Sequence, residues 1–244
     1  NYPSNIVVYC MGNKNVTKII QNLIECSNRI DNKIILFAFD SEISNACKHL
    51  CQVVNMYPYG EPYTKIGNIY YQKLLIANEI KKRNKIAMYI DADCIIQHDF
   101  KQDMLNQYTL TDADCLVQSV EHNQWLGEGI NCGTGIFSIR PTEKTKNMFT
   151  EKFFIDNNYD NYGDDLEFFN KVIKPNNMLK IHYLSKDDYP NGNHYHYNKE
   201  KISKTFKVFH VTNLYGYKDM DPTKEWEGIP QKIKSIKYLN YWYI

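Results

Sequence analysis

Hydrophobic and polar positions alternate in this chain in a way that predicts strands and helices in turn along its first half. The short apolar runs rich in β-branched residues are residues 5–10, 34–39 and 53–56. Apolar residues recur at helical spacing over residues 16–26, and Asp40 or Ser41 is a candidate N-cap for a helix extending to residue 50. Strands that alternate with helices predict a parallel sheet with right-handed crossovers.

A further apolar run at residues 86–90 follows the charged residues 81–85 and predicts a strand buried on both faces. This strand ends in two acids, Asp91 and Asp93, and ligands of open α/β sheets bind outside the carboxyl ends of strands. Two carboxylates so close together repel each other unless a cation lies between them, and Mg or Mn prefers such oxygen ligands. The alternative is a strand end followed by an Asx turn.

The same four residues, Asp-Ala-Asp-Cys, occur again at residues 112–115. This second copy precedes an apolar run, residues 116–120, instead of ending one. Asp112 and Asp114 should therefore lie at the amino end of a strand, away from the ligand face, and we predict a turn role for them.

The pattern is less regular in the remaining segments. Strands are predicted at residues 136–140, 180–184 and 207–210, helices at residues 69–80 and 141–153 and from residue 164 onward, and loops at residues 57–68, 156–162 and 185–201. The aromatic and basic residues 229–244 are predicted to pack across the sheet edge. His194 and His196 in the last loop could bind a metal, although such a pair is more often a surface feature.

Three charged residues lie at predicted helix starts, where their charge has a structural interpretation as well as a functional one. Lys73 lies in the first turns of its predicted helix, where a cation does not stabilise the helix dipole, so it could face a diphosphate or be a solvated surface lysine. Asp164 and Asp165 open another helix, where the dipole stabilises acids in any case. No glycine-rich phosphate loop of the ATPase or dinucleotide type follows any predicted strand.

Composition narrows the classes of partner. The formal net charge of the 244 residues is +1, which argues against a nucleic-acid partner or a broad anionic-membrane surface. The chain has 20 Tyr, which suit sugar or base stacking. No apolar run is long enough to cross a bilayer.

The seven Cys residues form no C-x-x-C pair and lie largely in apolar patterns, which favours a reducing compartment and hence the cytoplasm. A sequon at Asn15 and a first residue other than Met keep the Golgi or ER lumen open if an anchor was trimmed.

Taken in order, four pieces of the chain resemble the nucleotide-diphospho-sugar transferases of the GT-A fold. They are the helix with Lys73 before the strand ending Tyr-Ile-Asp-Ala-Asp at Asp93, the Asn-Cys-Gly-Thr-Gly segment 131–135 with its following strand, the helix start at Asp164, and the late His210 segment. The resemblance spans roughly residues 5–220 and implies one α/β domain, residues 1–244, of Rossmann-like GT-A type. It implies a mostly parallel central sheet with helices on both faces, a donor-binding half over about residues 1–120, and an acceptor and catalytic half over about residues 121–244.

The resemblance also implies site residues. Asp93 and His210 would bind a divalent ion, Mn or Mg, together with the donor diphosphate, and Asp91 would bind this ion or the donor ribose. The predicted donor-binding residues are Cys10, Met11, Lys73, Asp91, Ala92, Asn131, Gly133, Gly216 and Lys218. Cys10 and Met11 would flank the nucleotide base, Lys73 and Lys218 would offset diphosphate charge, and Asn131 with Gly133 would hold the sugar.

The implied activity is hexosyl or pentosyl transfer from a nucleotide-sugar donor, UDP-sugar foremost, to a hydroxyl of a glycan or glycoprotein acceptor. Asp164 and Asp165 are the predicted catalytic residues, one of them as general base if the enzyme inverts, or as a stabilising or attacking acid if it retains. Retention is the expected outcome.

Two other functions are compatible with parts of the sequence. A haloacid-dehalogenase-like, Mg-dependent phosphatase also ends a strand in D-x-D, but usually after its first strand rather than its fourth. A non-catalytic sugar-binding module of the same fold is the other alternative, because a fold does not guarantee an activity.

Overall fold

The computed structural model describes residues 5–56, 69–120, 126, 129–192, 194, 205–212 and 229–244. The predicted loop at residues 57–68, His196 and the predicted donor-binding residues Gly216 and Lys218 lie outside this described part.

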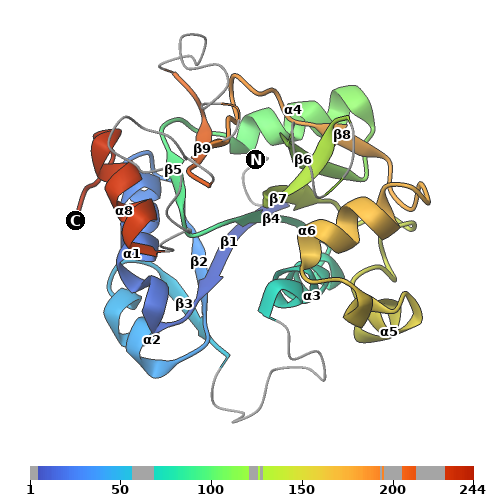
Figure 1. Cartoon of the computed structure of the whole chain (residues 1–244), viewed down its shortest axis with the longest axis horizontal. Helices are drawn as coiled ribbons and strands as arrows, with labels where there is room; N and C mark the ends of the chain where they lie inside the picture. The colour runs from blue at the N-terminus through green and yellow to red at the C-terminus, as the bar shows by residue number, and fades with distance from the viewer. Residues whose placement is uncertain are drawn as a thin grey trace.

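A sheet of seven strands lies at the centre of the described residues (Figure 1). In spatial order its strands are β3 (Gln52–Asn55), β2 (Ile35–Ala38), β1 (Ile6–Gly12), β4 (Ile86–Ile90), β7 (Asn131–Ile139), β6 (Cys115–Val120) and β8 (Ile181–Tyr183). Strand β7 is antiparallel to its neighbours β4 and β6, and the remaining pairs are parallel. The predicted mostly parallel α/β sheet is therefore confirmed.

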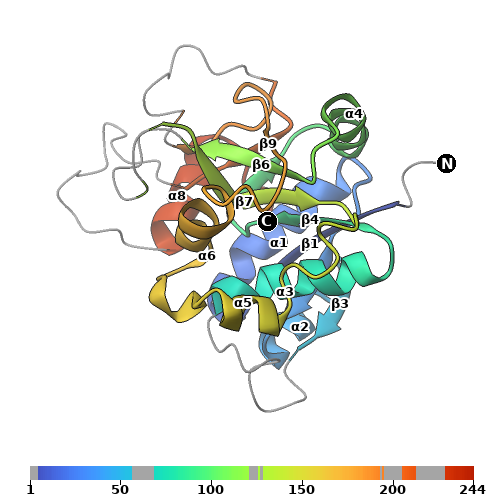
Figure 2. The same ribbon diagram turned by 90° about the vertical axis from the view of Figure 1, so that its right-hand side faces the viewer.

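Helices cover both faces of this sheet, as predicted. One face carries α1 (Thr17–Asn28), α2 (Ser41–Cys47), α4 (Lys101–Thr111) and α8 (Ile229–Tyr238). The other carries α3 (Ile69–Lys82), α5 (Glu151–Asp156), α6 (Asp165–Phe168) and the π-helical η4 (Phe169–Ile173). Figure 2 labels α3, α5 and α6 in the view turned by 90° from Figure 1. Short 3₁₀ helices, η2 (Lys14–Val16) and η3 (Tyr159–Asn161), lie in the connections.

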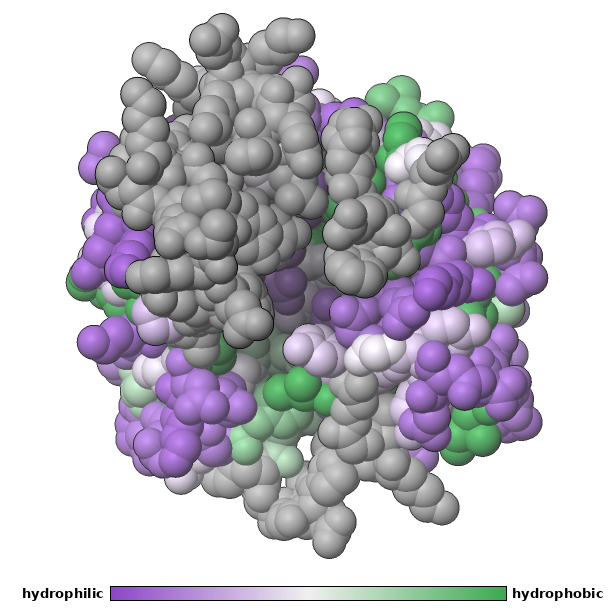
Figure 3. All heavy atoms as spheres, in the orientation of Figure 1, coloured by the Kyte–Doolittle hydropathy of each residue, from purple (hydrophilic) through white to green (hydrophobic). Residues whose placement is uncertain are grey.

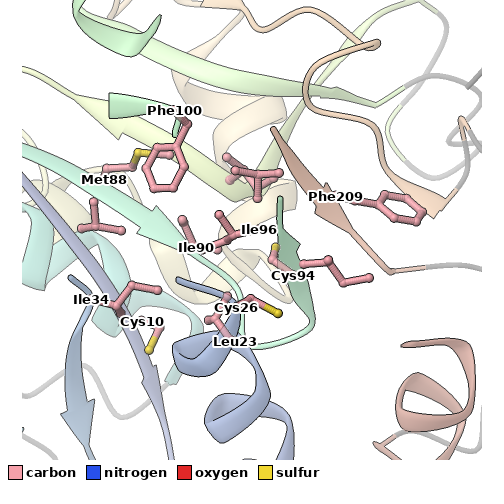
Figure 4. Packing of buried hydrophobic residues seen from close by; sticks show 14 of the residues in the cluster. Cys10, Leu23, Cys26, Ile34, Met88, Ile90, Cys94, Ile96, Phe100 and Phe209 are labelled. Carbon is pink, nitrogen blue, oxygen red and sulfur yellow. The ribbon is translucent and has the colours of Figure 1, made fainter. Parts of the chain in front are cut away.

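The strand at residues 86–90 is buried on both faces because its side chains alternate between two cores. Met88 and Ile90 of β4 belong to the core shared with α1 and α2, whereas Ala87 and Tyr89 belong to the core shared with α3. Figure 4 shows the first of these cores, with side chains from β1, β4 and α1 in contact.

A second, small sheet joins the chain beyond β4 to a much later segment. Strand β5 (Cys94–Ile96) pairs antiparallel with β9 (Val208–His210), and Cys94 lies opposite His210. This pairing brings two segments far apart in the sequence to one place (Figure 1).

Two predictions in the second half are wrong. Residues 143–149 form turns instead of a continuous helix, because Thr142 and Thr145 bond to nearby backbone groups and Phe149 has a left-handed φ of 66°. The short helix α5 then begins after Thr150, whose side chain accepts a hydrogen bond from the Phe153 amide.

The second wrong prediction concerns residues 229–244, which do not pack across the sheet edge. The amide of Asn22 on α1 donates to the Tyr241 carbonyl, and Gln97 donates to the Tyr241 hydroxyl. Ile236 enters the same core as α1, so this segment covers α1 and the region around β5.

Where it is described, the molecular face in Figure 3 is mostly hydrophilic, with small apolar patches. None of the described helices combines the length and the apolar character that a membrane span requires.

Candidate metal and donor site

The order of the strands within the sheet indicates where a ligand site is expected. Strands β2 and β3 lie on one side of β1, and β4 lies on the other, so the connections change direction between β1 and β4. The carboxyl ends of parallel strands at such a point form a crevice where ligands bind. Asp91 follows β4 directly at this place.

A tight turn connects β4 to β5 and carries the two acids. The Cys94 amide donates to the Asp91 carbonyl at 3.1 Å, so the main chain itself closes the turn. The Asp91 side chain instead accepts a hydrogen bond from the Tyr89 hydroxyl at 2.6 Å. The alternative of an Asx turn, in which the Asp side chain closes the turn, is therefore not what the structure has.

His210 reaches these acids through the pairing of β9 with β5. The Val211 amide donates to the Asp93 carbonyl at 3.0 Å, and the His210 amide donates to the Pro190 carbonyl at 3.0 Å. His210 Nε2 lies 3.4 Å from Asp91 Oδ2 and 3.3 Å from Asp93 Oδ1. Within the described residues, these three side chains form a group whose ligand atoms all lie within 4.8 Å of one another.

Gly135 on β7 makes room for this group. A Cβ at position 135 would overlap the His210 ring and lie 2.7 Å from Asp91 Oδ2. The Gly135 carbonyl also accepts the Asp91 amide at 2.7 Å, which fixes the start of the turn. Two carboxylate oxygens and one imidazole nitrogen in such a cradle form a donor set that suits Mn²⁺ or Mg²⁺.

Lys232 on α8 is a residue of this site that sequence reasoning missed. Its Nζ lies 2.6 Å from Asp93 Oδ2. Burial would raise the pKa of the Asp93 carboxyl, but His210 and Lys232 outweigh burial and hold this pKa well below its usual range. Asp93 is therefore ionised and ready to act as a ligand.

Lys73 and Asp165 come together as a buried ion pair on the α3 side of the sheet. Lys73 Nζ lies 2.7 Å from Asp165 Oδ2 and donates to the Thr134 carbonyl at 3.2 Å. Burial raises the pKa of Asp165 to about 6, although Lys73 opposes this shift. The alternative of a solvated surface lysine is wrong, because Lys73 is only 4% exposed. Its role toward a diphosphate stays a prediction.

The other predicted catalytic acid, Asp164, is the N-cap of α6. Its Oδ1 accepts a hydrogen bond from the Glu167 amide at 2.8 Å. Both predicted catalytic acids therefore have partners within the protein, and their catalytic role stays a prediction.

The remaining predicted donor residues are distributed around the same strand ends. Cys10 is fully buried against the α1 side, whereas Met11 packs partly buried on the opposite face of β1. Asn131 and Gly133 lie on β7, and a Cβ at Gly133 would come within 3.0 Å of the Gln118 carbonyl on β6. Ala92 lies in the turn after β4. Their contacts with a donor stay predictions.

Comparison with protein families decides the class of the molecule. The model of the nucleotide-diphospho-sugar transferase family matches residues 29–224. The chain belongs to this family. This transferase is thus a nucleotide-sugar glycosyltransferase, and membership in the family displaces the phosphatase and binding-module alternatives. A search of curated proteins finds no significant match.

Solved structures confirm that the transferase has the GT-A type fold. The apo form of mouse xyloside xylosyltransferase 1 is 10% identical, with a TM-score of 0.60 over 87% of this chain and 99% of that chain. The apo form of the glycosyltransferase GlyE from Streptococcus pneumoniae TIGR4 is 15% identical, with a TM-score of 0.59 over 98% of this chain. The transferase spans 63% of the GlyE chain. At these identities the likeness shows the fold alone.

Proposed function

We propose that this transferase moves a sugar from a UDP-sugar to a hydroxyl of a glycan or protein, with a divalent ion, Mn²⁺ or Mg²⁺, and with retention of configuration. The observation that carries the proposal is the convergence of Asp91, Asp93 and His210 within 4.8 Å beside the end of β4. A ligand crevice of an open α/β sheet is expected at this place.

Asp91, Asp93 and His210 are the residues that would hold the ion. A bound ion supplies an electrophile that offsets negative charge on the departing diphosphate. Gly135 keeps the space beside His210 open. Two predicted donor-binding residues, Gly216 and Lys218, lie outside the described residues, and in our proposal Lys218 adds positive charge for the diphosphate.

The proposed retention is supported by the partners of the two acids near α6. An inverting enzyme needs a base that takes the proton of the acceptor hydroxyl. Asp165 is buried against Lys73 Nζ at 2.7 Å, and Asp164 caps α6, so each carboxylate is already engaged. In our proposal an acid at this helix start stabilises or attacks the positively charged sugar of the transition state instead of taking the proton of the acceptor, and Lys73 offsets diphosphate charge.

The proposal is tested by incubating the protein with UDP-sugars and measuring UDP release with Mn²⁺, with Mg²⁺ and with EDTA. We expect slow hydrolysis, or transfer when an acceptor is supplied, only in the presence of the ion. Equal turnover in EDTA would contradict the metal dependence. A thermal-shift screen of nucleotide sugars with and without Mn²⁺ identifies the donor, because a ligand that binds the folded state raises its apparent stability.

A further inference from the structure

Each of the three predicted metal ligands has one polar atom engaged by a neighbouring side chain. The three contacts are Tyr89 hydroxyl to Asp91 Oδ1 at 2.6 Å, Gln118 Oε1 to His210 Nδ1 at 3.2 Å, and Lys232 Nζ to Asp93 Oδ2 at 2.6 Å. The other atom of each ligand, Asp91 Oδ2, His210 Nε2 or Asp93 Oδ1, faces the shared centre. The neighbours come from β4, β6 and α8.

Gln118 determines which nitrogen of His210 is available. Its Nε2 donates to the carbonyls of Tyr189 and Pro190 at 3.0 and 2.9 Å, so its Oε1 must face the His210 ring. An amide oxygen only accepts hydrogen bonds, so His210 Nδ1 carries a proton and donates it to Gln118 Oε1. His210 Nε2 is then the ring nitrogen that faces the two acids, and its lone pair would be the one offered to a bound ion.

Tyr89 fixes Asp91 in a similar way. Its ring is held between Tyr9 and Phe137, with ring centroids 5.3 and 5.6 Å away. Its hydroxyl donates to Asp91 Oδ1 at 2.6 Å. Asp91 Oδ1 is therefore occupied, and Asp91 offers Oδ2.

Lys232 occupies the second oxygen of Asp93. The Lys232 side chain is 22% exposed and that of Asp93 is 4% exposed, so this contact lies largely out of water. Asp93 is thereby limited to Oδ1 on the side of His210.

We infer that Tyr89, Gln118 and Lys232 are positioning residues that restrict each predicted ligand to one atom and thereby make the site prefer Mn²⁺ or Mg²⁺ to Ca²⁺. Ca²⁺ takes six to eight oxygen ligands and readily accepts both oxygens of a carboxylate, whereas Mg²⁺ demands a compact octahedral shell. Side chains that hold metal ligands commonly change metal affinity by about 10- to 100-fold when they are replaced. The inference rests on the proposed function, because it requires that the three ligands bind an ion.

The first test is calorimetric titration of MnCl₂ and CaCl₂ into the protein without donor, for wild type and Tyr89→Phe. This variant removes one oxygen and no charge. We expect its Mn²⁺ affinity to fall about tenfold and its Ca²⁺ affinity to fall less, so that the preference for Mn²⁺ decreases. Tyr108→Phe is the matched control, because Tyr108 is equally buried but donates to Ser138 Oγ instead.

The second test is the same titration with Lys232→Met. Loss of positive charge alone would strengthen binding of both ions equally and leave the ratio of their dissociation constants unchanged. Loss of positioning lowers the ratio of the Ca²⁺ constant to the Mn²⁺ constant, because Asp93 can then offer both oxygens to Ca²⁺. Lys144→Met is the control, since Lys144 Nζ lies 3.6 Å from Asp114 of the second Asp-Ala-Asp-Cys segment.

The outcomes separate the inference from the proposed function. If the wild type binds Mn²⁺ and the ratio is unchanged in both variants, the inference is overturned and the metal site stands. If the wild type binds neither ion, with or without UDP, the proposed metal dependence fails as well. Circular dichroism of each variant checks folding, and a Tyr89→Phe protein that does not fold leaves the decision to Lys232→Met.

Discussion

Asp91 and Asp93 follow strand β4, whereas Asp112 and Asp114, in an identical tetrapeptide, precede strand β6. The second pair is engaged by protein donors from the segments after β7 and before β8. Asp114 accepts hydrogen bonds from the Lys180 amide at 2.9 Å and the Thr142 hydroxyl at 3.2 Å, and Asp112 pairs with Arg140. The predicted position of this copy at the amino end of a strand is confirmed, and Asp112 is the C-cap of α4 in the short connection to β6.

The acids of the first copy, Asp91 and Asp93, face a histidine side chain. The histidine Nε2 lies 3.4 and 3.3 Å from their oxygens, in a space that only glycine at position 135 leaves open. The comparison teaches that position relative to the strand, rather than the tetrapeptide, determines whether the acids bind a ligand.

The largest expected difference between the copies is in activity. Asp93→Ala should lower UDP-sugar turnover about 100- to 1,000-fold, because electrostatic stabilisation of the leaving group is lost. Asp114→Ala should leave turnover of the folded protein unchanged and lower the free energy of unfolding by about 1–3 kcal/mol, because buried donors lose their acceptor. Initial rates and urea unfolding measure both effects, and equal loss of turnover in the two variants would remove the distinction.

A pH titration extends the comparison to Asp165, a buried carboxylate with a lysine partner. Burial raises the pKa of Asp165 to about 6, whereas His210 and Lys232 outweigh burial and lower that of Asp93. An unfolded Asp titrates near pH 4, so the native state binds an extra proton between about pH 4 and 6. The contribution of Asp165 is therefore full below pH 4 and is lost as the pH rises through 6, by about 2–3 kcal/mol.

Urea midpoints between pH 4 and 7 measure this contribution. Asp165→Asn alone leaves the buried Lys73 charge unpaired and should cost about 3–5 kcal/mol at neutral pH. The double variant Lys73→Met/Asp165→Asn avoids the unpaired charge and should lack the Asp165 slope. A double variant with the wild-type slope would show that another group titrates.

Gly135→Ala tests the cradle of the first copy. The added Cβ would displace His210 or Asp91, so Mn²⁺ affinity should fall about tenfold in a calorimetric titration. Gly163→Ala is the control, because the nearest atom to its Cβ would lie 3.5 Å away. Unchanged Mn²⁺ affinity in Gly135→Ala would mean that His210 does not bind the ion from its present position.

The smallest effect is expected for Asp112→Ala in the second copy. Its side chain is 78% exposed, and exposed ion pairs contribute little to stability. Turnover, Mn²⁺ affinity and the urea midpoint should match the wild type. A measurable loss of Mn²⁺ affinity would contradict the structural role of this copy.

The sequence predicted the first copy of the site because the signal is local. Residues 86–90 are apolar without interruption, and the acids follow directly, so strand and ligand face could both be read from one stretch. The alternation of strands and helices likewise predicted the sheet. The prediction of a helix at residues 141–153 is wrong although the apolar residues there recur at helical spacing. Threonine side chains that bond to the backbone and the left-handed φ of Phe149 interrupt the helix.

Contacts between segments far apart in the sequence could not be predicted from the pattern of hydrophobic and polar residues. The pairing of Lys73 with Asp165 depends on how α3 and α6 lie against β7, and each residue had been interpreted separately. Lys232 resembles the neighbouring lysines of α8 until the helix is placed beside Asp93. Gln118 did carry a signal, because a polar residue within the apolar run 116–120 must find a buried partner.

Titration of Mn²⁺ into wild type, Asp93→Ala and Asp114→Ala is the most direct test of the claim that only the first Asp-Ala-Asp-Cys segment binds the ion. Calorimetry in the presence of UDP should show one Mn²⁺ site in the wild type and in Asp114→Ala, and none in Asp93→Ala. Binding of Mn²⁺ to Asp93→Ala with wild-type affinity would contradict the account.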